Sequence, residues 1–107
     1  MEWWHGISYF FGGAFLGNAM PHLVTGGMGR SFPSPFAKPP GQGLSSPTVN
    51  VLWGVFSLAV AYALTCRVGE FSLRSTTHVA LLGAGFVLMG VVNARLFERF
   101  HGASIKS

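Results

Sequence analysis

The chain has 107 residues, of which 50% are hydrophobic and only 9% are charged, with seven Lys and Arg against three acidic residues. Because soluble domains carry about 25% charged residues, this composition excludes an ordinary water-facing surface, and the length allows one domain. The basic residues are too few and too scattered for the dense patch that a phosphate backbone requires, so we expect no nucleic-acid partner.

Long apolar stretches at residues 4–24, 48–66 and 76–97 are the dominant feature of the chain. Each has the length of about 20 residues with which a helix crosses the hydrocarbon core of a bilayer. We therefore predict an all-α integral membrane protein, a single transmembrane domain whose three helices form an antiparallel bundle. A cleaved signal peptide is the alternative for the first stretch, but Glu2 stands where such a peptide carries basic residues.

The first stretch combines a pair of glycines with a proline. Gly13 and Gly17 have the GxxxG spacing that lets two membrane helices approach closely. Pro21 cannot donate a hydrogen bond to the carbonyl of Gly17, so a helix kink is predicted at this pair. Asn18 and His22 stack on one face, which lies about 100° from the glycines. We expect this second face to contact a ligand or a partner outside the bundle.

The polar residues inside the apolar stretches also have a simpler interpretation. Asn18, Asn50 and Asn93 occur once per helix. Hydrogen bonds between such side chains hold membrane helices together and contribute about 1 kcal/mol each. His22 either shapes the end of the first helix or touches a substrate, ion or cofactor, because an ionisable group at membrane depth is by default a functional hypothesis.

The positions of the histidines argue against a haem or metal site. In an antiparallel bundle, His22 and His78 fall on opposite sides of the membrane and cannot share one iron. His5 could lie level with His78, and His22 with His101, but neither pair has the spacing of metal ligands. We expect neither a metal nor a cofactor.

Residues 25–47 are predicted to form a long loop rich in Gly and Pro, with five of the six prolines of the chain. Loops of this length are usually either functional or disordered. The apolar residues spaced through it favour a loop that folds back on the bundle or enters the headgroup layer, with disorder as the alternative. These residues are Met28, Phe32, Phe36 and Leu44. Arg30 and Lys38 are predicted to contact anionic lipid headgroups.

Ser46 and Pro47 predict the start of the second helix, because Ser is a preferred N-cap and Pro is favoured at the first helical position. Small and polar residues then recur on one face, which we expect to pack against the other helices. They are Asn50, Gly54, Ser57 and Ala61. The third stretch predicts a similar face, which comprises Ala80, Gly83, Val87, Gly90 and Ala94, and Asn93 is expected to contact another helix.

The distribution of Lys and Arg predicts the orientation. With three spans, the long loop and the C-terminal tail share one side of the membrane and carry five of these residues, whereas the other side has two. Short loops with an excess of Lys and Arg face the cytoplasm. We predict a multi-pass protein of the inner (plasma) membrane, with the N-terminus outside and the C-terminus in the cytoplasm.

The stretch from Asn18 to Gly54, NAMPHLVTGGMGRSFPSPFAKPPGQGLSSPTVNVLWG, resembles small multi-pass bacterial membrane proteins that have no assigned activity. This resemblance covers about a third of the chain and implies a membrane location only. The chain lacks the Thr-Thr-Phe-Ser-Thr-Phe run of small fluoride channels and the membrane-buried glutamate of small multidrug exporters.

No catalysis is expected, because Glu2, Glu70 and Glu98 are the only acids and each lies near a predicted helix end, so no carboxylate pair is available. We expect an accessory or self-assembling subunit of a membrane complex, with the lipid bilayer, further copies of the chain or other membrane subunits as partners. The alternative is a homo-oligomeric channel or transporter for a small solute or ion, with Asn18 and His22 near the pathway.

Overall fold

The computed structural model describes residues 2–40 and 42–101, and most of this part of the chain is helical. The elements in chain order are α1 (Trp3–Gly27), β1 (Phe32–Pro33), β2 (Leu44–Ser45), α2 (Pro47–Cys66) and α3 (Thr76–His101). The three helices coincide with the three apolar stretches, and α1 and α3 run a few residues beyond the predicted ends.

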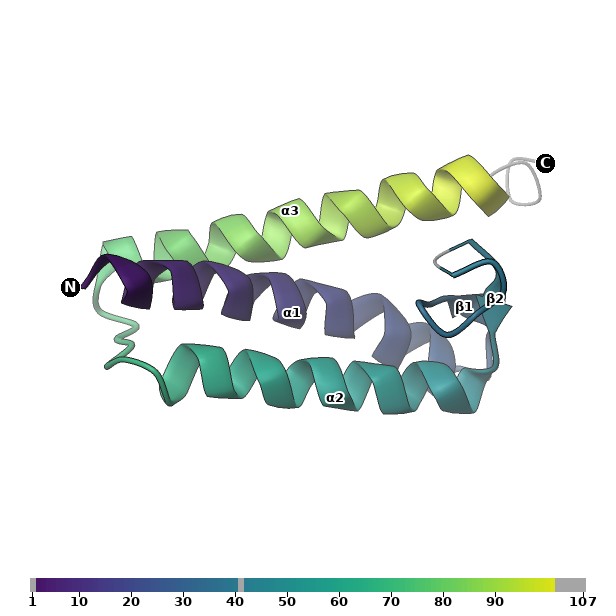
Figure 1. Ribbon diagram of the computed structural model, residues 1–107, viewed down its shortest axis with the longest axis horizontal. Coiled ribbons are helices and arrows are strands. Elements are labelled where there is room, and N and C mark those ends of the chain that lie inside the picture. Colours follow the sequence, from purple (N-terminus) through teal and green to yellow (C-terminus); the bar gives the residue numbers. More distant parts are fainter. Residues whose placement is uncertain (1, 41, 102–107) are drawn as a thin grey trace.

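Helix α1 occupies the centre of the structure. It packs against both α2 and α3, which scarcely touch each other. Successive helices run in opposite directions, so that the start of α1, the end of α2 and the start of α3 share one end of the molecule (Figure 1). The predicted antiparallel arrangement is therefore present, but α2 and α3 lie on different sides of α1 and do not close the bundle.

Small residues explain why α1 can pack on both neighbours. Gly12 and Gly26 lie against α2, where an added Cβ would meet Thr65 and Pro47 respectively. On its other side, Gly13 and Gly17 lie against the backbone of α3. Helix α2 in turn buries the residues at the centre of its predicted packing face, which are Asn50, Gly54, Ser57 and Ala61.

The contact face of α3 differs from the prediction. Gly83 and Gly90 were expected to pack against another helix, but a Cβ at either position would meet nothing within 4 Å. Gly85 makes the close contact instead, against the backbone of Phe10 and Ala14 in α1. The positions of the glycines in α1 determine which face of α3 packs against it. The spacing of small residues along α3 does not reveal this face.

The loop between α1 and α2 folds back over the end of α1. β1 and β2 form a short antiparallel ladder, in which Phe32 pairs with Ser45 and Pro33 with Leu44. Ser34 and Ser45 share a hydrogen bond of 2.5 Å beneath this ladder. The ring of Phe32 stacks on Phe97 of α3 at 5.2 Å, so the loop contacts α3 at the end of the molecule where α3 diverges from α1 (Figure 1). The expected folding of the loop onto the helices is observed.

Ser46 caps α2 as predicted. Its side-chain oxygen accepts a hydrogen bond from the backbone N–H of Val49 at 3.2 Å, and Pro47 is the first helical residue. The cap satisfies one of the free N–H groups of the first turn, and Pro47 has no N–H to satisfy. The start of α2 is thereby fixed directly beneath the loop.

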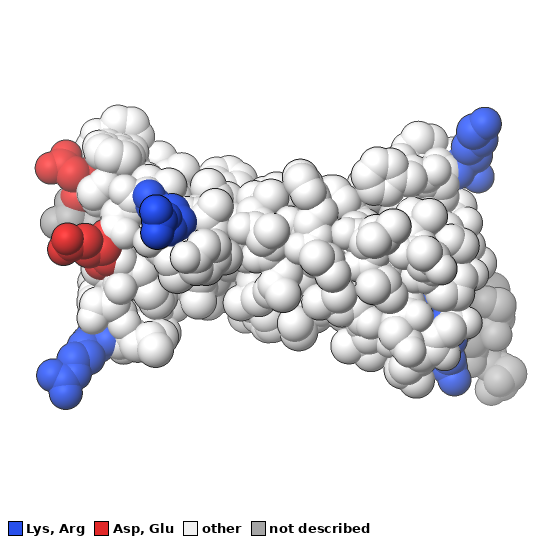
Figure 2. All heavy atoms as spheres, turned by 90° about the horizontal axis from the view of Figure 1, so that it is seen from below, with Lys and Arg blue, Asp and Glu red and all other residues white. Residues whose placement is uncertain are grey.

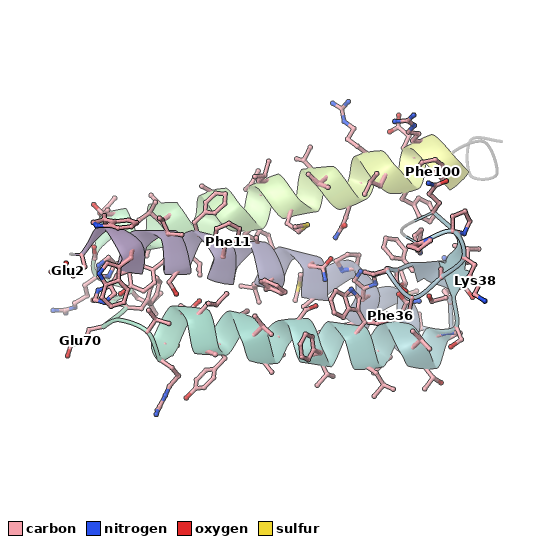
Figure 3. All side chains as sticks on the ribbon, in the orientation of Figure 1. Glu2, Phe11, Phe36, Lys38, Glu70 and Phe100 are labelled. Atoms are coloured by element: carbon pink, nitrogen blue, oxygen red, sulfur yellow. The ribbon has the colours of Figure 1, made fainter. Side chains whose placement is uncertain are left out.

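Charged side chains gather toward the two ends of the molecule. On the face shown in Figure 2, Lys, Arg and Glu lie near the ends and a broad uncharged region separates them. Glu2 and Glu70 lie at one end and Lys38 at the other (Figure 3). The molecule is 46 Å long, which exceeds the ~30 Å hydrocarbon core of a bilayer. An uncharged middle between charged ends is typical of helical proteins that cross a bilayer.

Two of the helices, α2 and α3, are long and apolar enough to cross a membrane on the basis of length and composition. Only 6% of the apolar window of α3 is buried, so most of its apolar side chains face outward. Helix α1, which carries Asn18, Pro21 and His22, is not among the helices that meet this criterion. These two outward-facing apolar helices support a membrane location.

Candidate functional site

Two of the most buried polar residues of the helices meet where α1, α2 and the loop converge. His22 of α1 is only 2% exposed and Asn50 of α2 is fully buried. The Nδ1 atom of His22 lies 2.6 Å from Oδ1 of Asn50. The Nδ2 group of Asn50 lies 3.0 to 3.1 Å from three carbonyl oxygens, which belong to Phe32, Ser45 and Ser46. Asn50 thus joins both helices to the loop.

These contacts define the hydrogen-bonding state of His22. The amide nitrogen of Asn50 must be the atom that faces the three carbonyls, because an amide oxygen there would meet only other acceptors. Its Oδ1 is therefore an acceptor, and Nδ1 of His22 donates to it. In the neutral imidazole the other ring nitrogen, Nε2, then carries a lone pair and acts as an acceptor.

A second polar chain crosses all three helices near the middle of the molecule. Asn93 of α3 donates from Nδ2 to Oδ1 of Asn18 at 3.3 Å, and Asn18 donates from its own Nδ2 to Ser57 of α2 at 2.9 Å. Ser57 is fully buried. The interpretation of the three asparagines as links between helices agrees with these hydrogen bonds.

A small cavity of about 120 Å³ adjoins both polar groups. Its walls combine the polar side chains of Asn18, His22 and Asn93 with apolar residues of the loop and of α3. The apolar walls are Phe32, Pro33, Pro35, Leu96 and Phe97, and Ser34 completes the lining. A mostly apolar cavity with a few convergent polar groups has the composition of a small-molecule site.

The sequence predicted that Asn18 and His22 lie on an outward face. In the structure they do not. Helix α2 covers the face that the sequence assigned to an outside partner, because α1 is central and uses two sides for its own neighbours. Gly17 is also buried within the chain, against the backbone of Phe86. Any ligand of Asn18 and His22 must therefore enter the interior between the helices. Any docking partner must bind to a different surface.

The remaining predicted contact residues lie away from this cluster. Arg30 and Lys38 are exposed in the loop, at the end of the molecule expected to face the cytoplasm. Helix α1 continues through Pro21 to Gly27, and Thr25 donates from its hydroxyl to the carbonyl of Pro21 at 2.5 Å. The kink predicted at Gly17 and Pro21 stays a prediction.

Several residues of the site were not singled out from the sequence. The ring of Phe32 meets that of His22 edge to face at 5.2 Å, and Trp53 approaches the same imidazole at 6.3 Å. Nε1 of Trp53 is buried and has no hydrogen-bond partner among the described residues. The spacing of apolar residues in the loop indicated that Phe32 would contact the helices. It does not specify which helix the ring contacts.

The opposite end of the molecule holds another polar cavity, which is lined by Glu2, His5, Glu70 and His78 among others. His5 and His78 share this end, as their positions in an antiparallel bundle require. Nδ1 of His78 accepts a hydrogen bond from the N–H of Ser72 at 3.0 Å. Within residues 2–40 and 42–101 no group of three or more His, Cys, Asp and Glu side chains is arranged to hold a metal ion. The side chain of His101, the other suggested partner of His22, lies outside the described residues.

Comparison of the chain with protein-family models, with curated proteins and with solved structures finds no match. The function must therefore be inferred from the geometry of the chain itself.

Proposed function

We propose that the protein is a small integral membrane protein, with three helices across the inner membrane, that acts as an accessory or self-assembling subunit of a membrane complex and has no catalysis of its own. The observation that carries this proposal is an unpartnered face of small residues on α3. This face, called the α3 seam below, comprises Ala80, Gly83, Val87, Gly90 and Ala94.

The membrane placement rests on the arrangement of charges. Helices α1 and α2 contain no Lys, Arg, Asp or Glu, and those of α3 begin only at Arg95. If α2 and α3 cross the bilayer, α1 lies between them with a comparable length, 25 residues against 20 and 26, and shares their environment. Its polar side chains do not oppose this placement, because Asn18 and His22 are hydrogen-bonded within the chain.

The α3 seam has the spacing of a helix-packing surface. Its residues alternate steps of three and four, the pattern with which left-handed helix pairs pack in membranes. Gly83 and Gly90 have open space beyond them, so the chain itself does not use them. Glycine in a helix costs about 1 kcal/mol relative to alanine. The cost of two glycines on this face is explained if the backbone of a neighbouring helix packs closely against them.

The same observations favour the subunit over a channel. Three helices that leave α2 and α3 apart enclose no pathway, so conduction would need several copies around a shared axis. Asn18 and His22 would have to face that axis, whereas here they bond to Ser57 and Asn50 within the chain. We place the outward contact on α3 and not on the face of α1 that carries these residues.

The test is the composition of complexes extracted gently from the native membrane. Replacing Gly83 and Gly90 together by Leu should release the partner or dissociate the oligomer, as measured by native mass spectrometry. The control is Ala59→Leu, which enlarges an exposed side chain of α2, away from the α3 seam. An unchanged complex in the Gly83→Leu/Gly90→Leu variant would refute the assignment, as would equal dissociation in the control.

A further inference from the structure

We propose that the cavity beside His22 binds the hydroxyl-bearing aromatic head of a membrane-soluble amphiphile, a long-chain phenol or hydroquinone, whose apolar body lies in the groove between α1 and α3. The cavity that would hold the head contains no residue of the α3 seam, whereas the groove that would hold the body borders the seam. It does not require that the chain assemble with a partner.

His22 supplies the first reason. It is 98% buried, because only 2% of its surface is exposed, and its Nδ1 is committed to Asn50. The imidazole also lines the small cavity. With Nδ1 directed to α2, the ring edge that carries Nε2 is the part left for the cavity. The only hydrogen bond that the described residues make to this ring is the one at Nδ1. An acceptor on the wall of a cavity, in a residue buried this deeply, gains a hydrogen bond only from a donor that occupies the cavity.

The composition of the cavity defines the head of the ligand. No charged side chain lines it, so a charged headgroup would be desolvated without a counter-charge. Asn93 uses its Nδ2 for Asn18, which leaves its Oδ1 as a second acceptor beside His22. The ligand must therefore be a neutral donor, and a hydroxyl group meets this requirement.

The shape of the cavity favours a planar head. Its volume of about 120 Å³ exceeds that of one water, which occupies ~30 Å³ in the liquid. The aromatic rings of Phe32 and Phe97 and the rigid pyrrolidine rings of Pro33 and Pro35 contribute to its walls. Aromatic heads pack favourably against such surfaces. A phenol presents both the ring that these walls accommodate and the hydroxyl that His22 accepts.

The neighbouring groove provides for the apolar body. It has a volume of about 610 Å³, lies between α1 and α3, and adjoins the Phe32–Phe97 pair. The two cavities share three residues, Phe32, Asn93 and Phe97. The lining of the groove is mostly apolar and includes Gly17, Met20 and Pro21 of α1, with Asn93 and Glu98 of α3 as its polar members. In the proposed pose the head occupies the cavity at His22, and the tail extends past Phe32 and Phe97 among the apolar side chains of the groove.

The groove borders the α3 seam, because Gly90 and Ala94 belong to both. Gly83 belongs to the seam but lines neither cavity. The Gly83→Leu variant therefore separates the two proposals, since it should impair assembly and leave ligand binding unchanged.

The test uses the purified protein in detergent micelles with ¹⁵N-labelled histidine. Titration with 4-decylphenol should produce a saturable shift of one Nε2 resonance, assigned to His22 by its loss in His22→Phe. The methyl ether of this phenol has the same apolar body but cannot donate, so it should bind about tenfold more weakly or worse. A shift that is equal for the ether, or absent for the phenol because only water fills the cavity, would overturn the proposal.

Two variants keep the test decisive if His22→Phe fails to fold. Leu96 is 40% exposed at the rim of the cavity, and Leu96→Trp should fill the cavity while leaving His22 and Asn50 in place. This variant should weaken phenol binding at least about tenfold, by the same reasoning as for the ether. The control is His5→Phe at the opposite end, which should bind the phenol as the unmodified protein does. Unchanged binding by Leu96→Trp would overturn the placement of the head.

Discussion

The contact between α1 and α3 depends on the absence of a side chain at Gly17, and Gly17→Ala tests this dependence. A Cβ added there would lie 2.6 Å from the carbonyl oxygen of Phe86. That oxygen belongs to the backbone of α3 and cannot rotate away as a side chain could. Ordinary van der Waals contact begins at 3.4 Å, so the two helices would have to separate by about 0.8 Å.

The expected cost follows from this separation. Gaps of about 0.5–1 Å forfeit a quarter to a half of the dispersion energy of each atom pair, and overpacking of a close contact typically costs about 1–3 kcal/mol. Alanine also has the better helix propensity, by about 1 kcal/mol, which partly hides this cost. The matched control Gly83→Ala gains the same propensity but meets nothing within 4 Å. The difference between the two variants therefore isolates the contact, and we expect Gly17→Ala to be less stable by about 1–3 kcal/mol.

The free energy of unfolding is measured by titrating the protein from mild detergent into dodecyl sulfate and following its helical circular dichroism. Gly85→Ala provides a second comparison on α3 itself, because its Cβ would overlap the backbone of Phe10, and it should resemble Gly17→Ala. Equal stability of Gly17→Ala and Gly83→Ala would refute the packing of α1 on α3 described here.

Three further variants test the loop and the polar cluster. Asn50→Asp keeps the acceptor for His22 but replaces the amide donor by an oxygen that faces three carbonyls. The free energy of unfolding in the same titration should therefore fall by about 2 kcal/mol or more. An unchanged midpoint would contradict this geometry. Ser46→Ala removes the N-cap of α2 and should cost about 1 kcal/mol, seen as faster hydrogen exchange at Val49; unaltered exchange would mean that the cap contributes nothing. Phe32→Ala removes the stacked contact with Phe97, and tryptic cleavage in the loop should accelerate about tenfold or more; a rate equal to that of the unmodified protein would show that this ring does not hold the loop.

The elements and several of their ends could be predicted because local composition determines them. Long apolar stretches specify the helices, and Ser46 followed by Pro47 specifies the start of α2 through a hydrogen bond within one turn. The buried face of α2 could also be identified, because its small and polar residues all lie on one side. Each of these features depends on residues close together in the sequence.

The relation between the helices could not be predicted in the same way. The third stretch offers glycines on more than one face, and the choice of Gly85 over Gly83 and Gly90 depends on where Phe10 of α1 presents its backbone. The outward facing expected for Asn18 and His22 was wrong for a related reason. The sequence shows that they share a face, but not that α1 is central and that α2 covers this face.

The small cavity beside His22 could not be predicted from the sequence because residues from three distant segments build it. Phe32 comes from the loop, His22 from α1 and Phe97 from α3. Apolar spacing in the loop indicated that it would meet the helices, but contact between Phe32 and Phe97 spans a long separation in the sequence. Only the assembled fold brings these rings together.

The placement of all three helices across the membrane is tested most directly by labelling single cysteines from one side. Cys66 is the only cysteine of the chain, is exposed, and ends α2 near the start of α1. In the background Cys66→Ser, Glu2→Cys and Ser31→Cys report on the two ends of α1, and both positions are exposed. In spheroplasts, a membrane-impermeant maleimide should label Cys66 and Glu2→Cys but not Ser31→Cys, which should react only in inside-out vesicles. Labelling of Glu2→Cys and Ser31→Cys from the same side would show that α1 does not cross the membrane.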